Sequence, residues 1–313
     1  MANILQGLVI FIAIVLCIVL VALGGLNIAK FFIYADYYSI EETICTNPGL
    51  NDGFVCQGIA ISEENGKILV SGYMQDKTNS RIYVTDLDSN SYYVELTRNG
   101  GEKYTGHAGG IAITGNTVYI SNGSKLYIFS LLDVLNAKNG DTIDIGFGVK
   151  VNSAASFVFA DEDYVYVGEF NNPAEEQKEH IYETPNGTNH SIVEKYAHDD
   201  LENPVKIYSI GDYVQGVCFT PDGRIVFSTS YGLTSSNYYV YRESDATDSG
   251  NVLDGAPVYY LGECIQHVSG PAMSEDMDFY NGKVLTLSES ACNKYIFGKF
   301  FFAFDIVALD FAK

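Results

Sequence analysis

QGIAIS, at residues 57–62, is the first of five related stretches whose recurrence is the strongest indication of the fold. The other four are GGIAIT at 109–114, ASFVFA at 155–160, QGVCFT at 215–220 and EDMDFY at 275–280. Their spacing of about 50 residues is typical of the repeated units of a β-propeller. We therefore expect five equivalent units, each with one of these stretches as a strand.

A second strand is predicted after each stretch, following a short turn. These second runs are KILVSGY at 67–73, TVYISNG at 117–123, YVYVGEF at 164–170, RIVFSTS at 224–230 and KVLTLSE at 283–289. The turns contain the Asn, Asp and Gly residues that tight hairpins need. In the first unit, RIYVTDLD at 81–88 and SYYVELTR at 91–98 complete a four-stranded meander, which is a propeller blade. The second unit repeats this order with KLYIFSLL at 125–132 and TIDIGFGVKV at 142–151.

The chain is thus predicted to be all-β, a β-propeller of five blades. Six blades are the alternative, because residues 171–211 are longer than two outer strands require. We interpret them as the outer strands of the third blade with an inserted polar hairpin at 184–190. The aromatic segment FFIYADYYSIEE at 31–42 is expected to pair with the last blade, whose third strand is FDIVALDF at 304–311. Such pairing closes the ring and removes exposed sheet edges.

The N-terminal region is predicted to cross a membrane once. Residues 4–28 are almost wholly apolar and carry no charge, and about 20 such residues suffice to span a bilayer. We divide the chain into a transmembrane signal-anchor, residues 1–33, and a propeller domain, residues 34–313. Cleavage as a signal peptide near residues 22–25 is the alternative. Lys30 follows the span and by the positive-inside tendency favours a cytoplasmic propeller.

The cysteines favour the opposite side of the membrane. Cys17 lies in the span, and five cysteines remain in the propeller domain. Their positions predict two disulfides, Cys45 with Cys56 and Cys264 with Cys292, and a buried Cys218. Disulfides persist in oxidising compartments, so we place the propeller on the extracytoplasmic side of the cell membrane. Five reduced cysteines of an intracellular protein are the alternative.

Composition excludes some ligands. The chain has 39 Asp and Glu against 18 Lys and Arg, a formal net charge of −21. Such an acidic surface repels nucleic acid and anionic lipid headgroups. Its 24 Tyr and 18 Phe with no Trp suit sheets packed face to face. Motifs for zinc, calcium, phosphate and a nucleophilic serine are all missing from the sequence, so no cofactor is expected.

The candidate site lies where the inner strands of a propeller begin, because their first residues converge on the central axis. By alignment these residues are Gln57, Gly109, Ala155, Gln215 and Glu275, with His107 and Ser274 just before and Glu289 in an adjacent strand. We predict that a polar ligand binds Gln57, Gln215, Ser274 and Glu289. The alternative is structural, with Gly58, Gly109, Gly110 and Gly216 allowing close packing and the amides bonding to neighbouring blades.

Two residues are candidates for catalysis. Glu275 is predicted to face a narrow channel, where loss of water would raise the pKa of its carboxyl group, a feature of functional sites. His107, next to two glycines, has the side chain of a general base or metal ligand. A hydrogen-bonded structural histidine is the alternative. Asp276 and Asp278 alternate with Glu275, and Asp278 is expected to lie paired between sheets.

The phrases QGIAIS, HAGGIAIT, QGVCFTPDGRIVFSTSYG and SEDMDFYNGKVLTLSESACNKY resemble the group of propellers that includes regucalcin, gluconolactonase, strictosidine synthase and paraoxonase. They also resemble membrane-anchored bacterial propellers of no known activity. The calcium-dependent hydrolases of that group are six-bladed and hold their metal on the axis with one Glu and several Asn or Asp residues. The resemblance assigns this metal-binding role to Glu275. The positions of its partners hold Gln57, Gly109, Ala155 and Gln215 instead.

Two functions follow from these observations. The first is a non-catalytic module outside the cell that binds a polar small molecule, a glycan or a protein through the channel mouth and the loops at 73–79, 232–237 and 290–294. The second is a metal-assisted lactonase or esterase, with calcium or another metal on Glu275, or with Glu275 as base, and His107 assisting proton transfer. Catalysis requires Glu275 and His107 within reach of one substrate.

Overall fold

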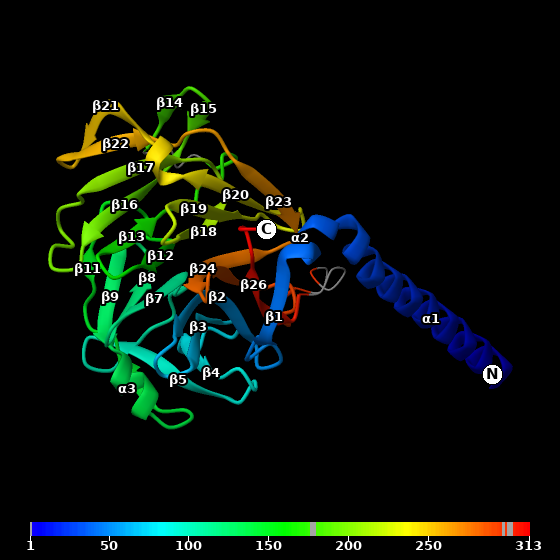
Figure 1. Ribbon diagram of the computed structural model, residues 1–313. Coiled ribbons are helices and arrows are strands. Elements are labelled where there is room, and N and C mark those ends of the chain that lie inside the picture. The colour runs from blue at the N-terminus through cyan, green and yellow to red at the C-terminus, as the bar shows by residue number, and fades with distance from the viewer. Residues whose placement is uncertain (1, 176–179, 296–297, 299–302) are drawn as a thin grey trace.

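The computed structural model describes residues 2–175, 180–295, 298 and 303–313. Its strands form a five-bladed β-propeller around a central axis (Figure 1), as the repeats predict. Each repeated stretch is the inner strand of a blade: β2 (Phe54–Ser62), β7 (Gly110–Thr114), β12 (Phe157–Ala160), β18 (Val214–Phe219) and β24 (Ser274–Tyr280). Each pairs antiparallel with the predicted second strand: β3 (Lys67–Met74), β8 (Thr117–Ser121), β13 (Tyr164–Gly168), β19 (Arg224–Thr229) and β25 (Lys283–Ser288).

The outer strands complete the blades in chain order. The first blade adds β4 (Arg81–Thr85) and β5 (Ser91–Arg98), and the second adds β9 (Lys125–Ser130) and β11 (Val149–Lys150). The third adds β16 (Ser191–Ala197) and β17 (Lys206–Ile210), and the fourth adds β20 (Ser236–Arg242) and β23 (Gln266–Gly270). The predicted polar hairpin of the third blade is present as β14 (Tyr182–Thr184) and β15 (Gly187–Asn189). Residues 171–211 therefore hold no further blade in the part that the structure describes.

The ring closes where the two ends of the chain meet. The fifth blade consists of β24, β25, β26 (Asp305–Leu309) and β1 (Glu41–Thr46), and β1 runs antiparallel to β26. The partner of the closing strand was predicted correctly, but most of the predicted strand at 31–42 was wrong. Residues 35–40 form helix α2 (Ala35–Ile40) instead. Tyr34, Tyr37 and Ile40 are buried at a spacing of three residues, which is helical rather than alternating.

Two segments cross from one blade to the next. The predicted outer strand at 142–151 is divided: β10 (Thr142–Asp144) pairs in parallel with β5 of the first blade, and only β11 stays with the second. The hairpin of β21 (Thr247–Leu253) and β22 (Ala256–Tyr260) interrupts the fourth blade, and β22 pairs in parallel with β17 of the third. The remaining short elements are β6 (Glu102–Lys103), α3 (Leu131–Asn136) and η1 (Glu243–Asp245). These exchanges join neighbouring blades at their outer edges.

Helix α1 (Ala2–Ile33) extends away from the ring (Figure 1). Residues 4–33 are long enough to cross a membrane and contain an 18-residue window with a mean hydropathy of 3.2. Helix α2 fixes the start of the propeller domain against the fourth blade. The Tyr37 ring stacks on Tyr238 with centroids 5.9 Å apart, and the hydroxyls of Tyr34 and Ser235 are 3.0 Å apart.

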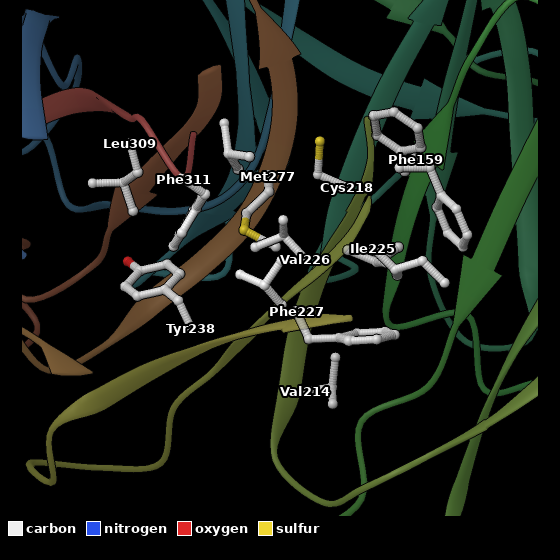
Figure 2. Packing of buried hydrophobic residues seen from close by; sticks show 14 of the residues in the cluster. Phe159, Val214, Cys218, Ile225, Val226, Phe227, Tyr238, Met277, Leu309 and Phe311 are labelled. Carbon is white, nitrogen blue, oxygen red and sulfur yellow. The ribbon is translucent and has the colours of Figure 1, made fainter. Parts of the chain in front are cut away.

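Apolar side chains fill the space between blades, away from the axis. Figure 2 shows one cluster, to which Phe159 of the third blade, Val226 of the fourth and Met277 and Leu309 of the fifth contribute side chains. Cys218 is buried within this cluster, as predicted. The interior is therefore apolar between the blades, and polar side chains gather at the axis.

Candidate functional site

A pocket of about 420 Å³ lies on the axis, at the end of the ring where the inner strands begin. Six of the residues predicted to converge there line it: Gln57, His107, Gly109, Ala155, Gln215 and Glu275. Glu289 also lines it, from the end of β25. The pocket thus collects side chains from the whole length of the chain.

The pocket residues of three inner strands sit at irregularities in the strand pairing. The register of β2 against β3 shifts between Cys56 and Gly58, which leaves Gln57 unpaired. The same shift between Val214 and Gly216 leaves out Gln215. In β24 the shift falls between Ser274 and Met277 and includes Glu275. β-Bulges turn side chains away from the regular alternation and occur next to functional sites.

Glycines let the inner strands approach one another below the bulges. A Cβ atom on Gly58 would lie 2.4 Å from Ser71 Oγ and 2.6 Å from the Ile111 nitrogen. A Cβ atom on Gly216 would lie 2.7 Å from the Cα of Asp276. No side chain fits at such distances, so the predicted packing role of these glycines is confirmed. In each of the Gln-Gly pairs at 57–58 and 215–216, the glutamine therefore lines the pocket and the glycine lets the backbone contact a neighbouring inner strand.

The floor of the pocket is a pair of acidic side chains, Glu275 in β24 and Glu289 directly after β25. Gln57 Nε2 donates a hydrogen bond to Glu289 Oε2 at 2.9 Å and links the first blade to the fifth. Glu275 is only 4% exposed, and burial followed by repulsion from Glu289 raises the pKa of Glu275 well above its usual value. Burial raises the pKa of Glu289 to about 7, although Tyr295, Lys294 and Gln57 stabilise its charge. The raised pKa values of both groups favour protonation of the pair over its doubly ionised form.

Two clusters of aromatic side chains lie at the pocket, one from the first and fifth blades and one from the third and fourth. On one side Lys294 Nζ donates hydrogen bonds to the hydroxyls of Tyr73 and Tyr295 and lies 4.8 Å and 4.7 Å from their ring centroids. On the other side the rings of Tyr213 and Tyr231 stack with centroids 5.0 Å apart, and Phe170 lies 6.1 Å from Tyr213. Apolar walls around a few polar groups are the usual composition of a small-molecule site.

His107 lies at the rim of the pocket. Its ring stacks on Tyr73 with centroids 4.7 Å apart, and its backbone N–H donates to Asn122 Oδ1 at 2.9 Å. Partial burial, with a smaller effect of Lys294, lowers the pKa of His107. Its imidazole is therefore neutral at pH 7 and lines the same pocket as Glu275.

The remaining predicted ligand residue, Ser274, is placed outside the pocket lining. It is buried, its hydroxyl is 2.7 Å from that of Ser228, and its backbone N–H donates to Ser236 Oγ at 2.9 Å. Ser274 therefore joins the inner strand of the fifth blade to β19 and β20 of the fourth. The regular alignment of the repeats placed it at the channel because it could not include the bulge at Glu275.

Asp276 and Asp278 serve the backbone of neighbouring blades. Asp276 Oδ2 accepts a hydrogen bond from the Ile111 N–H at 3.1 Å, across the axis in the second blade. Asp278 Oδ2 accepts from the Ile61 N–H of the first blade at 2.7 Å. The paired position predicted for Asp278 between sheets is thus confirmed. Burial raises the pKa of Asp278 to about 7.

Several pocket residues were not predicted individually. Tyr73, Gly232 and Lys294 fall in loops named as binding loops, but Asn122, Ser156, Phe170, Tyr231 and Tyr295 do not. Aligning the ends of the second strands would have found some of them, because Tyr73, Asn122, Phe170, Tyr231 and Glu289 follow or end those strands. The second strand runs antiparallel to the inner strand, so a residue at its end lies at the end of the ring where the inner strand begins.

The donor set does not fit a metal ion. Among the described residues, no three His, Cys, Asp or Glu side chains come together in a way that could hold one. Calcium takes six to eight oxygen ligands and prefers carboxylates, whereas the neighbours of Glu275 in the pocket include the amides of Gln57 and Gln215. The metal-binding role that the resemblance assigns to Glu275 therefore finds no support here.

The predicted disulfide pairs are not formed in the part of the chain that the structure describes. Cys264 is exposed in the loop before β23, and its thiol donates to the Gln266 carbonyl at 3.1 Å. Cys292 is buried in a different region, beside Cys56, with the two sulfur atoms 3.7 Å apart. The structure thus brings together one cysteine from each predicted pair.

A larger cavity of about 570 Å³ lies away from the axis, near the turn between β18 and β19. It contains Lys206, Arg224 and Arg242 together with Asp222 and Glu243. Arg224 forms an ion pair with Asp222 at 2.7 Å, and Tyr208 donates to Glu243 at 2.5 Å. These groups satisfy one another, so the axial pocket is the better candidate for a binding site.

No protein-family model and no curated protein matches this chain. Solved structures are similar to it at low identity. Kuenenia stuttgartiensis hydrazine synthase has a TM-score of 0.39 and 11% identity, covering 77% of this chain and 58% of that one, so the chain spans less than two thirds of that protein. The PQQ-bound aldose sugar dehydrogenase of Streptomyces coelicolor has a TM-score of 0.43 and 14% identity, covering 79% and 76%.

A putative oxidoreductase (glucose dehydrogenase) of Thermus thermophilus has a TM-score of 0.40 and 10% identity, covering 86% of this chain and 99% of that one. These similarities concern the propeller fold and carry no functional argument. The resemblance to the regucalcin and gluconolactonase group stays a prediction, and the five blades differ from the six of that group.

Proposed function

We propose that the protein is a membrane-anchored, extracytoplasmic binding module whose axial pocket takes a neutral, polyhydroxylated small molecule or the end of a glycan. The observation that carries this proposal is the convergence of Gln57, Gln215, Glu275 and Glu289 on one pocket between aromatic walls. An amide side chain both donates and accepts hydrogen bonds, and a protonated carboxyl group does the same. The hydroxyl groups of a ligand need both donors and acceptors as partners.

The charge of the floor supports a neutral ligand. Burial raises the pKa of Glu275 well above its usual value and that of Glu289 to about 7, and Lys294 lies beside them. Raised pKa values reduce the negative charge of this pocket, although the whole chain is strongly acidic. A cationic ligand would be repelled by Lys294, and an anionic ligand by the ionised fraction of Glu289. A neutral ligand avoids both repulsions.

The aromatic walls support a ligand with apolar as well as polar faces. Sugar rings present C–H groups on their faces and hydroxyls at their edges. Tyr73 and Tyr295 on one side and Tyr231 on the other offer flat apolar surfaces with hydroxyls at the tips. The ligand faces would contact the rings while its hydroxyls reach the polar floor.

The membrane location in this proposal rests on helix α1. A helix of membrane-spanning length leads directly into the propeller, and α2 packs against the fourth blade. The acidic surface suits a domain that stays in solution beside a membrane and does not bind anionic headgroups. Protease digestion of sealed membrane vesicles tests the side, because a propeller on the outside is degraded in intact cells and protected in inside-out vesicles.

The binding proposal is tested by thermal shift and calorimetry with the purified full chain in detergent. The probes are glucose and galactose as neutral sugars, gluconate as an anion and choline as a cation. A ligand that binds only the folded state raises the melting temperature, and we expect a rise with neutral sugars alone. A rise with gluconate or choline and none with sugars would contradict the proposed ligand class.

Variants locate the site. Gln57→Leu removes a hydrogen-bonding amide from the floor, and we expect about tenfold weaker binding of the same sugar. Glu64→Gln is the matched control, because Glu64 is exposed in the turn at the opposite end of the same hairpin. Equal affinities of both variants would place the ligand elsewhere.

One observation favours a second function, a hydrolase without a metal. Glu275 and the neutral His107 line the same pocket, which meets the geometric condition that catalysis by this pair requires. A carboxyl group and an imidazole that reach the same substrate can transfer protons in ester and lactone hydrolysis. Turnover of simple lactones and aryl esters by the wild type, lost in both Glu275→Gln and His107→Ala, would establish it. Absence of turnover leaves the binding function.

A further inference from the structure

We propose that Cys56 and Cys292 form a disulfide bond that joins the first blade to the fifth beside the axial pocket. Their sulfur atoms are 3.7 Å apart, although 236 residues separate them in sequence. Both side chains are fully buried and belong to the same core cluster. This pairing differs from both pairs that the sequence spacing favours.

The surroundings hold the two thiols in place. The Cys56 thiol accepts a hydrogen bond from Asn47 Nδ2 at 3.1 Å and donates to the Ser288 carbonyl at 3.5 Å. The Cys292 backbone N–H donates to the Glu289 carbonyl at 2.9 Å, within the turn that follows β25. A disulfide needs a sulfur–sulfur distance of about 2.05 Å, so small side-chain rotations at two contacting sulfur atoms suffice.

The cross-link would lie at the closing junction, which we define as the contact of β2 with β24 and β25. No strand pairing joins the first and fifth blades in the described sheets, and their contacts include the bond from Gln57 to Glu289 and the bond from the Ile61 N–H to Asp278. Cys56 immediately precedes Gln57, and Cys292 lies between Glu289 and Lys294. The bond would therefore fix the two segments that form the pocket floor relative to each other.

The reaction is a thiol–disulfide exchange with a disulfide-donating oxidoreductase or an oxidised low-molecular-weight thiol. One cysteine thiolate attacks the disulfide of the donor and forms a mixed disulfide, and the second cysteine thiolate then displaces the donor. The two protein thiols lose two protons and two electrons in total, and the donor becomes a dithiol. Burial raises the pKa of Cys56 well above its usual value in the folded protein, so exchange is expected before the ring closes.

In the cell this bond rests on the extracytoplasmic location proposed above, because reducing compartments prevent it. The chemical test does not depend on location. The full chain is unfolded, reduced, and refolded in detergent with a mixture of oxidised and reduced glutathione. Remaining thiols are alkylated at acid pH, and the digest is analysed by mass spectrometry without reduction.

We expect the peptides containing Cys56 and Cys292 to appear as one cross-linked species, with Cys218 and Cys264 alkylated. Complete alkylation of Cys56 and Cys292, or their linkage to any other cysteine, would overturn the proposal. A linked pair after refolding but alkylated thiols in protein isolated from membranes would keep the disulfide chemistry and contradict the extracytoplasmic location instead.

Stability provides a second readout. We expect reduction to lower the melting temperature of the oxidised protein by about 5–10 °C, because the bond closes a very long loop. Cys56→Ser and Cys292→Ser should lose this dependence on reductant. Cys218→Ser is the matched control, since Cys218 is equally buried but lies in another cluster, and it should keep the full dependence. A dependence that persists in Cys56→Ser would also overturn the proposal.

Discussion

The acidic side chains of β24 occupy two different environments within four residues. Glu275 faces the axial pocket, where its neighbours are side chains: Glu289, Lys294 and Gln57. Asp276 reaches across the axis to the backbone N–H of Ile111, and Asp278 lies between the fifth and first blades at the N–H of Ile61. Both environments raise the pKa of the buried carboxyl groups.

This difference separates structural from functional acids. A buried carboxylate that accepts backbone hydrogen bonds is part of the scaffold, because the N–H groups of adjacent strands have no substitute partner. A carboxyl group that faces a pocket and other side chains is available to a ligand. A shifted pKa alone does not make the distinction, whereas the identity of the hydrogen-bond partners does. The following predictions test this comparison in order of expected effect.

Asp276→Ala should produce the largest loss of stability. The substitution leaves the buried Ile111 N–H without an acceptor and removes the stabilisation that Asp276 gives to the backbone of the second blade. We expect the free energy of unfolding to fall by about 3 kcal/mol or more, measured by urea denaturation. A loss below about 1 kcal/mol would contradict a structural role.

Asp278→Ala should cost less, about 2 kcal/mol. Asp278 is partly exposed, and water can replace the carboxylate as acceptor for the Ile61 N–H more readily than at Asp276. The same denaturation series measures the difference. If the two substitutions reversed this order, exposure would not be what distinguishes the two aspartates.

The pH dependence of the free energy of unfolding shows whether an acidic side chain has a higher pKa in the folded protein than in the unfolded chain. Glu289 titrates near pH 7 in the folded protein and near 4.5 when unfolded, so the folded state binds more protons between these values. Stability should therefore fall as pH rises from about 5 to 8. In Glu289→Gln this fall should be smaller by about 2 kcal/mol, as measured by denaturation at several pH values. An unchanged slope would indicate that Glu289 is ionised throughout this range.

Glu275→Gln should have the smallest effect on folding. The neutral amide resembles the protonated carboxyl group, and removal of one acid relieves repulsion with Glu289. We expect the free energy of unfolding to change by less than about 1 kcal/mol, while binding of a neutral sugar changes. Differential scanning calorimetry and titration calorimetry measure the two quantities on one sample. A loss comparable to that of Asp276→Ala would assign Glu275 to the scaffold.

The sequence predicted the ring and most of the pocket because both depend on the repeated hairpins. Gln57, Gln215 and Glu275 occupy equivalent positions in their repeats, so their convergence required only a common axis. Ser274 lies outside the pocket lining, next to a register shift in β24 that no local sequence pattern records. The same holds for β10 and β22, whose partners lie in neighbouring blades.

Helix α2 and the cysteine contact were missed for related reasons. The aromatic residues at 34–40 fit an alternating pattern as well as a helical one, and packing of Tyr37 on Tyr238 decides between them. The contact of Cys56 with Cys292 joins residues that are distant in sequence, so spacing favoured nearer partners. Long-range contacts that do not repeat from blade to blade are the part that sequence reasoning did not predict.

The strand β1 is synthesised early, yet its partner β26 lies more than 250 residues later in the chain. A nascent propeller is therefore an open arc, in which β1 stays an unpaired edge until β26 has been made. Unpaired edges favour aggregation of partly folded chains. Premature termination before residue 305 should accordingly yield insoluble protein, and not a smaller stable domain.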